Sequence, residues 1–220
     1  MTERRIQLTA DGSHTIFVPE LGEHYHSVHG SIAESLHVFI ENGLNRTTAP
    51  EVSILEMGFG TGLNALLTCL ACQVTGRRAR YEAWEKYPLL PNEFGMLNYG
   101  NLLGGDPTLL QRIHEAPWGS PCRIEEELIL TKKVGDIRSF SSDSRFDLVY
   151  FDAFGPDVQP ELWTVELFSK IAEALDNHAI LVTYSVKGLV RRNLKEAGFT
   201  VTKVPGPKGK REMTVAFRRH

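Results

Sequence analysis

The sequence predicts a doubly wound α/β fold with a mostly parallel sheet. From about residue 50 onward, strand-like and helix-like runs alternate along the chain, an order typical of parallel strands joined by crossover helices. Residues 146–151, FDLVYF, are apolar enough for a central strand that is buried on both faces. At 220 residues the chain is long enough for one sizeable core and short for two, so we expect a single domain over residues 1–220.

The first part of the chain is predicted to form an extension that precedes the core. An Asp-Gly pair at residues 11–12 separates two alternating runs within residues 5–18, which is a strong signal for a β-hairpin. From Ser31 onward apolar residues recur at helical spacing, and the helix is expected to end near Gly43. We therefore assign residues 1–48 to an N-terminal hairpin and helix.

The core, residues 49–220, is predicted to contain seven strands. They are expected at residues 52–57, 79–85, 128–134, 146–151 and 178–184, and in the stretches that begin at Phe199 and Met213. Helices are expected at about residues 62–74, between the second strand and residue 116, and at residues 160–175 and 188–197. No internal repeat, low-complexity tract or linker divides this core.

Composition excludes several classes of protein. With 42% hydrophobic and 23% charged residues, the chain is an ordinary globular protein and not a disordered, collagen-like or membrane protein. The N-terminus, MTERRIQLT, lacks the apolar core of a signal peptide, so we expect a cytoplasmic protein with no membrane partner. Cys69, Cys72 and Cys122 fit a reducing compartment, and the first two lie inside a predicted helix, where core packing is favoured over redox work.

Charge is distributed unevenly along the chain. Residues 187–220 carry ten Lys and Arg against two acids, whereas residues 1–186 carry 14 against 25. A basic end on an acidic body suits a protein that meets a phosphate backbone, although a solvated helix face followed by a charged tail is equally consistent with it. The loop at residues 205–211, PGPKGKR, is a candidate phosphate contact through Lys210 and Arg211, with ordinary solubility as the alternative.

A glycine-rich loop, residues 56–62 (EMGFGTG), joins the first core strand to the next helix. Gly58, Gly60 and Gly62 would let the backbone turn tightly and approach a ligand without obstruction by a Cβ atom. The spacing differs from the G-x-G-x-x-G of dinucleotide binders, and Glu56 would face a pyrophosphate unfavourably. The loop therefore predicts a site for a cationic ligand.

The pattern E-x-G-x-G-x-G resembles motif I of the class I S-adenosylmethionine-dependent methyltransferases, whose cofactor carries an amino group and a sulfonium. Two more acids follow successive strands. Glu85 stands where such folds place an acid on the ribose hydroxyls, and Asp136 matches the acid that faces the adenine amine. Taken singly, Glu85 is consistent with an exposed strand-end charge and Asp136 with a turn or helix cap. Their order along the chain favours the cofactor site.

Asp152 ends the fourth core strand and is followed by Phe154 and Pro156. Members of the superfamily hold the group to be methylated at this position. Methyl transfer to an amine is an in-line displacement, so a neutral nitrogen must stand about 3 Å from the methyl group. A carboxylate beside that nitrogen can accept an N–H hydrogen bond and later take the proton.

Several segments together resemble the methyltransferase half of the bacterial bifunctional tRNA enzyme that completes 5-methylaminomethyl-2-thiouridine at the wobble position. The resemblance extends from about residue 11 to residue 217 and implies a Rossmann-like class I methyltransferase fold. Its segments are residues 25–27 (YHS) with Gly30 and Glu34, residues 56–64 (EMGFGTGLN), residues 85–88 (EKYP), residues 152–156 (DAFGP) with Trp163, and residues 210–213 (KREM).

The resemblance implies transfer of a methyl group from S-adenosylmethionine to the primary amine of 5-aminomethyl-(2-thio)uridine in the anticodon stem-loop of tRNA. Asp152 would be the catalytic or amine-orienting residue, and Phe154 or Trp163 would support a base splayed out of the loop. Implied cofactor contacts are Tyr25, Glu56, Gly58, Gly60, Gly62, Glu85 and Asp136; implied substrate contacts are Phe154, Pro156, Trp163, Lys210 and Arg211. The bifunctional enzyme also has a flavin-dependent oxidase domain beyond the part that these 220 residues resemble, so we expect a separate oxidase to act upstream and supply the free amine.

Other functions remain open from the residues alone. An aminopropyltransferase like spermidine synthase uses a similar sheet, but its glycine loop is usually richer in glycine and acid, and a basic C-terminus would serve no polyamine. A small-molecule amine N-methyltransferase and a non-catalytic tRNA-binding module are further alternatives. His24, His26 and His29 lack the spacing of a helical zinc motif, and no metal is expected.

Overall fold

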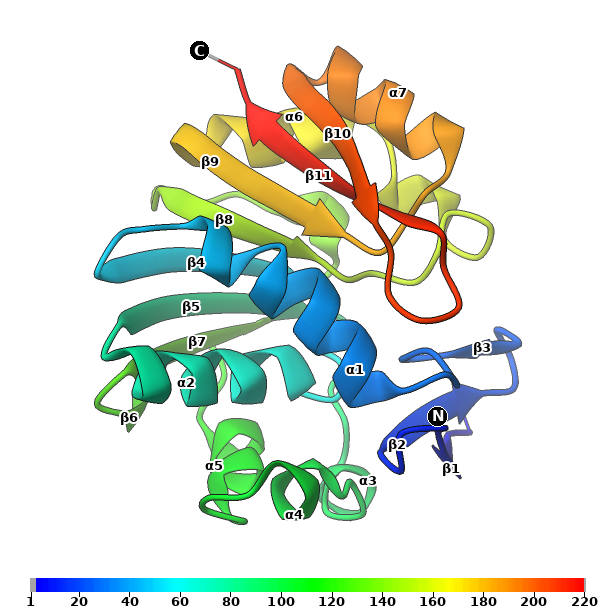
Figure 1. Ribbon diagram of the computed structural model, residues 1–220, viewed down its shortest axis with the longest axis vertical. Coiled ribbons are helices and arrows are strands. Elements are labelled where there is room, and N and C mark those ends of the chain that lie inside the picture. The colour runs from blue at the N-terminus through cyan, green and yellow to red at the C-terminus, as the bar shows by residue number, and fades with distance from the viewer. Residues whose placement is uncertain (1–2, 220) are drawn as a thin grey trace.

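A computed structural model describes residues 3–219, in which helices cover both faces of a central twisted sheet (Figure 1). Within these residues the sheet has eight strands in the order β10-β11-β9-β8-β4-β5-β7-β6. The five inner strands β7, β5, β4, β8 and β9 are mutually parallel, and β11 lies antiparallel between β9 and β10. The doubly wound fold predicted from the sequence is confirmed. The strands are β4 (Glu51–Met57), β5 (Arg78–Glu85), β6 (Pro121–Glu125), β7 (Leu128–Val134), β8 (Phe146–Phe151), β9 (Leu175–Thr183), β10 (Phe199–Pro205) and β11 (Glu212–Arg218).

The strand count differs from the predicted seven because β6 adds an eighth strand at the edge of the sheet. It pairs antiparallel with β7, and only Ile124 of its five residues is buried. A short edge strand with one buried side chain has no regular alternation of apolar and polar residues, so the sequence pattern gives no signal for it.

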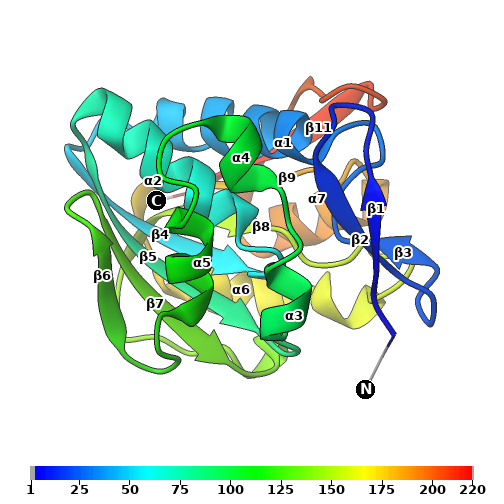
Figure 2. The same ribbon diagram turned by 90° about the horizontal axis from the view of Figure 1, so that it is seen from below.

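Helices form a separate hydrophobic core on each face of the sheet. On one face α2 (Leu63–Thr75) packs with α1 (Ser31–Ser35), its π-helical continuation Leu36–Glu41 and α5 (Leu109–Glu115). On the other face α6 (Val165–Glu173) and α7 (Gly188–Glu196) bury residues such as Phe168 and Leu194. The short helices α3 (Pro91–Phe94) and α4 (Tyr99–Leu103) lie beside α5 (Figure 2).

The predicted helix at residues 160–175 is divided in the structure. A 3-10 turn occupies Pro160–Leu162, and α6 begins only at Val165 because the Thr164 hydroxyl accepts a hydrogen bond from Leu167 N and caps the helix. Strand β9 already begins at Leu175.

The N-terminal extension forms a small sheet beside the carboxyl ends of the parallel strands (Figures 1 and 2). The predicted hairpin is present as β1 (Arg5–Leu8) and β2 (His14–Val18), and β3 (Glu23–His24) pairs with β2 as a third strand. The extension then leads into α1, which crosses one face of the main sheet. Among residues 3–219, no helix has the length and apolar character that a membrane span requires.

Candidate active site

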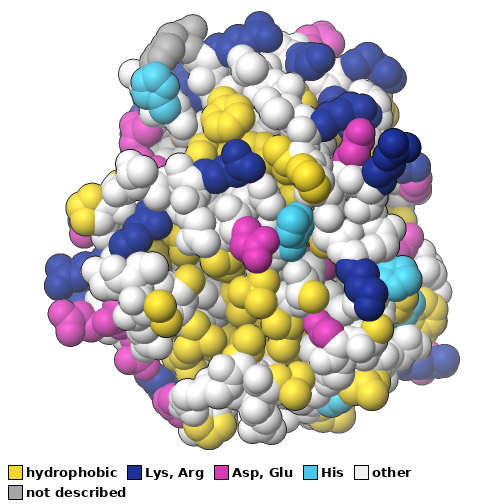
Figure 3. All heavy atoms as spheres, in the orientation of Figure 1, with side chains coloured by type: hydrophobic (Ala, Val, Ile, Leu, Met, Phe, Trp, Pro, Cys, Tyr) yellow, Lys and Arg dark blue, Asp and Glu magenta, His cyan; other side chains and the backbone are white. Residues whose placement is uncertain are grey.

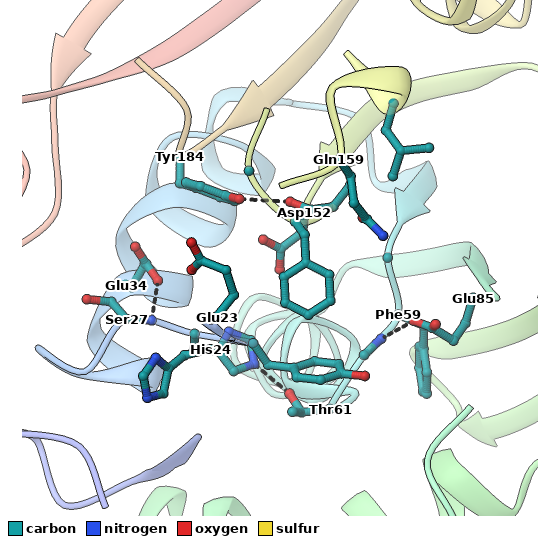
Figure 4. A pocket seen from close by; sticks show the side chains of 18 of the residues that line it. Glu23, His24, Ser27, Glu34, Phe59, Thr61, Glu85, Asp152, Gln159 and Tyr184 are labelled. Carbon is teal, nitrogen blue, oxygen red and sulfur yellow. Dashed lines mark hydrogen bonds between the residues drawn. The ribbon is translucent and has the colours of Figure 1, made fainter. Parts of the chain in front are cut away.

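A cavity of about 440 Å³ opens at the carboxyl edge of the sheet. Its walls come from the glycine loop, the ends of β5 and β8, the N-terminal extension and the loop between β10 and β11 (Figure 4). Parallel strands joined by helices leave a crevice at this edge, where the chain reverses its direction of winding. Of the residues predicted to act, those that line it are Tyr25, Gly58, Gly60, Glu85, Asp136, Asp152, Phe154 and Lys210.

The glycine loop forms the floor of the cavity between β4 and α2. Gly58 has φ of 97°, and a Cβ atom there would stand 2.6 Å from the backbone oxygen of Asp152. Gly60 has φ of 49°, and a Cβ atom there would stand 2.9 Å from the Tyr25 ring. Both positions combine a left-handed backbone with close contacts, so only glycine fits without strain. Gly62, which precedes α2, does not line the cavity.

Glu85 holds the end of β5 to the glycine loop. One carboxylate oxygen accepts a hydrogen bond from Gly60 N at 2.9 Å, and the other accepts one from Tyr87 N at 2.8 Å. Figure 4 shows the carboxylate at the side of the cavity. Each oxygen of a carboxylate has two lone pairs, so both retain one for a ligand.

Asp136 lines the cavity, but its carboxylate is already engaged. It accepts hydrogen bonds from Arg138 N at 3.0 Å and from the Arg138 guanidinium, and Lys86 Nζ lies 3.0 Å away. These interactions, chiefly those with Arg138, hold the pKa of Asp136 far below its usual value. Asp136 thus caps the turn Ile137–Ser139, which is the role that the sequence left open beside cofactor binding.

Glu56 lies beneath the glycine loop and does not line the cavity. Its side chain is fully buried, Oε1 accepts a hydrogen bond from Asn64 Nδ2 at 2.9 Å, and Oε2 has no hydrogen-bond partner among the described residues. Burial raises the pKa of Glu56 well above its usual value. Glu56 therefore supports the floor of the site from below and does not reach a ligand in the cavity.

Asp152 stands at the tip of β8 and faces the cavity. Its Oδ2 atom accepts a hydrogen bond from Asn64 Nδ2 at 2.8 Å. Burial raises the pKa of Asp152 well above its usual value, and the Asn64 hydrogen bond opposes that shift. A carboxylate with a raised pKa is a stronger proton acceptor than an exposed one.

Opposite Asp152, the extension and the C-terminal loop meet through an ion pair. Lys210 Nζ lies 2.6 Å from Glu34 Oε1 and 4.1 Å from the centre of the Tyr184 ring. Tyr184 OH donates to Ala153 O at 2.8 Å, beside Asp152 (Figure 4). The sequence predicts no role for Tyr184, because a tyrosine at the end of a predicted strand carries no signal of the cavity it enters.

Three predicted substrate residues do not line the cavity: Pro156, Trp163 and Arg211. The expectation that Trp163 could stack on a base is wrong, because its side chain is 1% exposed and packs against Phe151 at 4.8 Å between ring centres. Its indole N–H donates to Phe154 O at 2.8 Å, so Trp163 anchors the loop that carries Phe154. Arg211 is exposed on the loop between β10 and β11.

A family model described as S-adenosyl-L-methionine-dependent methyltransferase matches residues 109–219. The chain belongs to this methyltransferase family. A solved structure, MNMC2 from Aquifex aeolicus, is 30% identical with a TM-score of 0.77 and covers 98% of this chain and 70% of that one. The same fold occurs in spermidine synthase from Thermotoga maritima, at 12% identity with a TM-score of 0.52 over 99% of this chain and 74% of that one.

Sequence relatives of this methyltransferase carry a more specific name. The bifunctional protein MnmC for tRNA 5-methylaminomethyl-2-thiouridine biosynthesis is 33% identical in Burkholderia multivorans over 91% of this chain. The protein of the same name in Ralstonia nicotianae is 34% identical over 96% of this chain. This methyltransferase spans about one third of the length of both relatives, 33% and 34% respectively.

The residues at the cavity floor fit the cofactor of this methyltransferase. Gly58 and Gly60 line the cavity with backbone alone, and Glu85 offers free lone pairs beside them. The aromatic rings of Tyr25 and Phe154, 5.2 Å apart, bound the same space from above. A glycine floor, an acid with lone pairs free to accept hydroxyl hydrogen bonds and aromatic walls together suit an adenosyl group.

Proposed function

We propose that this methyltransferase transfers a methyl group from S-adenosylmethionine to the primary amine of 5-aminomethyl-(2-thio)uridine at the wobble position of tRNA. The name of the MnmC relatives supports this substrate, and their likeness to this chain spans more than 90% of it. The observation that carries the proposal is the position of Asp152, a desolvated carboxyl at the tip of β8 within the cofactor cavity.

The chain's own residues can bind and orient both reactants. When bound, S-adenosylmethionine supplies an electrophilic methyl group. Gly58 and Gly60 would hold the cofactor against the floor, Glu85 would accept its ribose hydroxyls, and Tyr25 would cover it. Gly62, Glu56 and Asp136 would act indirectly, by shaping the loop and the turn that border the site.

Asp152 would then accept a hydrogen bond from the substrate amine and direct the nitrogen lone pair toward the methyl group. As the new N–C bond formed and the bond between the methyl group and the cofactor's sulfur broke to leave a neutral thioether, the nitrogen would become cationic and lose one proton to the carboxylate. The raised pKa of Asp152 suits this role, because general bases work best when their pKa lies near the operating pH. Phe154 and Pro156 would shape the pocket for the uridine, with Trp163 fixing the backbone of Phe154.

The anticodon stem-loop would meet the basic end of the chain. Lys and Arg side chains gather on the part of the surface built by α7, β10 and β11 (Figure 3). Lys210 faces the cavity from the loop between β10 and β11, whereas Lys208 and Arg211 of the same loop are exposed and unpaired with any acid among residues 3–219. Exposed cations beside a site favour a polyanionic substrate.

The test is methyl incorporation from labelled S-adenosylmethionine into bulk tRNA from cells that lack this enzyme, followed by mass spectrometry of the nucleosides. We expect a gain of one methyl group on 5-aminomethyl-2-thiouridine. The Asp152→Asn variant should keep its affinity for the cofactor and lose at least about 100-fold in kcat. Cofactor binding without any methylation of tRNA would overturn the proposed substrate and direct attention to amine metabolites.

A further inference from the structure

The buried side-chain amide of Asn64 connects two acids, Glu56 and Asp152. Asn64 lies in the first turn of α2 and is 2% exposed. Its Nδ2 atom donates to Glu56 Oε1 at 2.9 Å and to Asp152 Oδ2 at 2.8 Å, so both of its N–H groups are used on carboxyls. Asp152 is 88 residues away along the chain, and this contact links the glycine loop and helix to the tip of β8.

The two carboxyls that share Asn64 have different environments. Glu56 is fully sealed from solvent, and the charge of Asp152 adds to burial in raising the pKa of Glu56. Asp152 borders the open cavity and has a cation in its surroundings. Of the pair, Asp152 has the position that favours the negative charge, because it alone borders the cavity and lies near Lys210.

Other groups also act on Asp152. Glu34 on α1 raises its pKa, and Lys210 on the loop between β10 and β11 lowers it. Tyr184, after β9, lies close enough for its own pKa to be raised by Asp152. Glu34 and Lys210 are paired with each other at 2.6 Å, so their opposite effects on the pKa of Asp152 largely cancel. The Asn64 amide is the direct hydrogen-bond donor to the Asp152 carboxylate among residues 3–219.

We propose that Asn64 is a positioning residue for methyl transfer: its amide holds the Asp152 carboxylate in the ionised, correctly rotated state that accepts the proton of the substrate amine. This inference rests on the proposed function, in which Asp152 meets the amine. An N–H donor stabilises a carboxylate more than a carboxylic acid. A fixed Oδ2 atom also leaves Oδ1 as the oxygen available to the substrate.

Removal of the Asn64 amide should change the pH dependence of activity, which loss of packing alone would not change. Without its donor, Asp152 becomes harder to ionise, so a larger fraction is protonated at a given pH and cannot accept the proton. Activity should then be lost at low pH and recovered as the pH rises. Loss of packing alone would lower activity equally across the pH range.

The experiment measures kcat against pH for wild type, Asn64→Ala and Asn64→Ser, with Asn193→Ala as the matched control. The amide of Asn193 also donates a partly buried hydrogen bond, but to the backbone oxygen of Trp163 at 2.7 Å and not to a carboxyl. For Asn64→Ala we expect the acid limb of the pH profile of kcat to move upward by about one pH unit, which is about a tenfold loss of kcat on that limb. Serine keeps one donor and should shift the limb less than alanine.

Two readouts separate this inference from the proposed function. Cofactor affinity, measured by calorimetry, reports folding and should change less than threefold in the Asn64 variants. The titration of a ¹³C-labelled Asp152 carboxyl, followed by NMR without substrate, should show the same upward shift as the kinetic limb. A uniform loss of kcat with an unmoved limb and an unmoved carboxyl titration would overturn the role of Asn64. Full activity of Asp152→Asn would instead overturn the role of Asp152 in the proposed function.

Discussion

The substitution Glu56→Gln tests whether the acid of the glycine loop is charged. Its side chain is 0% exposed, with one hydrogen bond from Asn64 and an Oε2 atom that has no partner among residues 3–219. Burial, as the largest cause, raises the pKa of Glu56 well above its usual value, and we therefore expect a neutral carboxylic acid at pH 7. Glutamine has nearly the same shape and is neutral at every pH.

The expected effect on stability follows from proton linkage. In the unfolded chain a glutamate ionises near pH 4.3, so the folded state binds more protons than the unfolded state above that pH. When the pKa of the folded state is raised, the free energy of unfolding is undiminished below about pH 4.3. Above that pH it falls by about 1.4 kcal/mol for each pH unit, until the pKa of the folded state is reached. At pH 7 the loss amounts to at most about 3.7 kcal/mol, and Glu56→Gln removes it.

Thermal unfolding from pH 4.5 to 8 measures this difference. For a domain of this size, about 1 kcal/mol corresponds to about 2–4 °C in Tm, so the variant should gain on the order of 10 °C over wild type at pH 7 and little at pH 4.5. Glu166→Gln is the control, because the Glu166 side chain is 79% exposed and should change stability by less than about 0.5 kcal/mol. A variant less stable than wild type at pH 8 would show that Glu56 is ionised and refute the reasoning.

Three further predictions concern the cavity and its surroundings. Trp163→Ala should cost about 3–5 kcal/mol in the free energy of unfolding, measured in urea, because it empties a core site; a loss below about 1 kcal/mol would contradict its place in the core. Gly58→Ala should weaken cofactor binding at least tenfold by calorimetry, since its Cβ atom would stand 2.6 Å from Asp152 O, and unaltered affinity would contradict the floor geometry. The double variant Lys208→Ala with Arg211→Ala should lower the slope of log Kd against log salt by about 1.5 for an anticodon stem-loop, measured by fluorescence anisotropy. An unchanged slope would show that the RNA does not contact Lys208 and Arg211.

Much of the fold could be predicted from the sequence because its signals are local. The alternation of strands and helices, the hairpin at residues 11–12 and the glycine loop are each encoded within a few neighbouring residues. The edge strand β6 escaped prediction because an edge strand with a single buried residue has no apolar period. The break before α6 escaped it because a threonine cap competes with a continuous apolar pattern on either side.

The site was predicted in part, because some of its signals are also local in the sequence. Carboxyl ends of parallel strands meet at one edge of a sheet, so Glu85, Asp136 and Asp152 could be placed near the glycine loop from their order alone. What each side chain does there depends on partners that are distant in sequence. The pattern that marks Asp136 as a cofactor acid does not show that Arg138 and Lys86 engage it. A tryptophan beside the site could not be distinguished from a core residue until its burial was known.

The sequence by itself determined the order of the elements, the cofactor loop and the acid at the tip of β8, since each depends on residues adjacent in the chain. Only the tertiary structure decided the electrostatics of the site. The charge of a carboxyl depends on its desolvation and on the donors within about 3 Å, and these come from across the fold. Asn64 reaches Asp152 over 88 residues, and Lys210 reaches Glu34 over 176. Packing of the whole sheet brings such groups together, and no local pattern of residues encodes it.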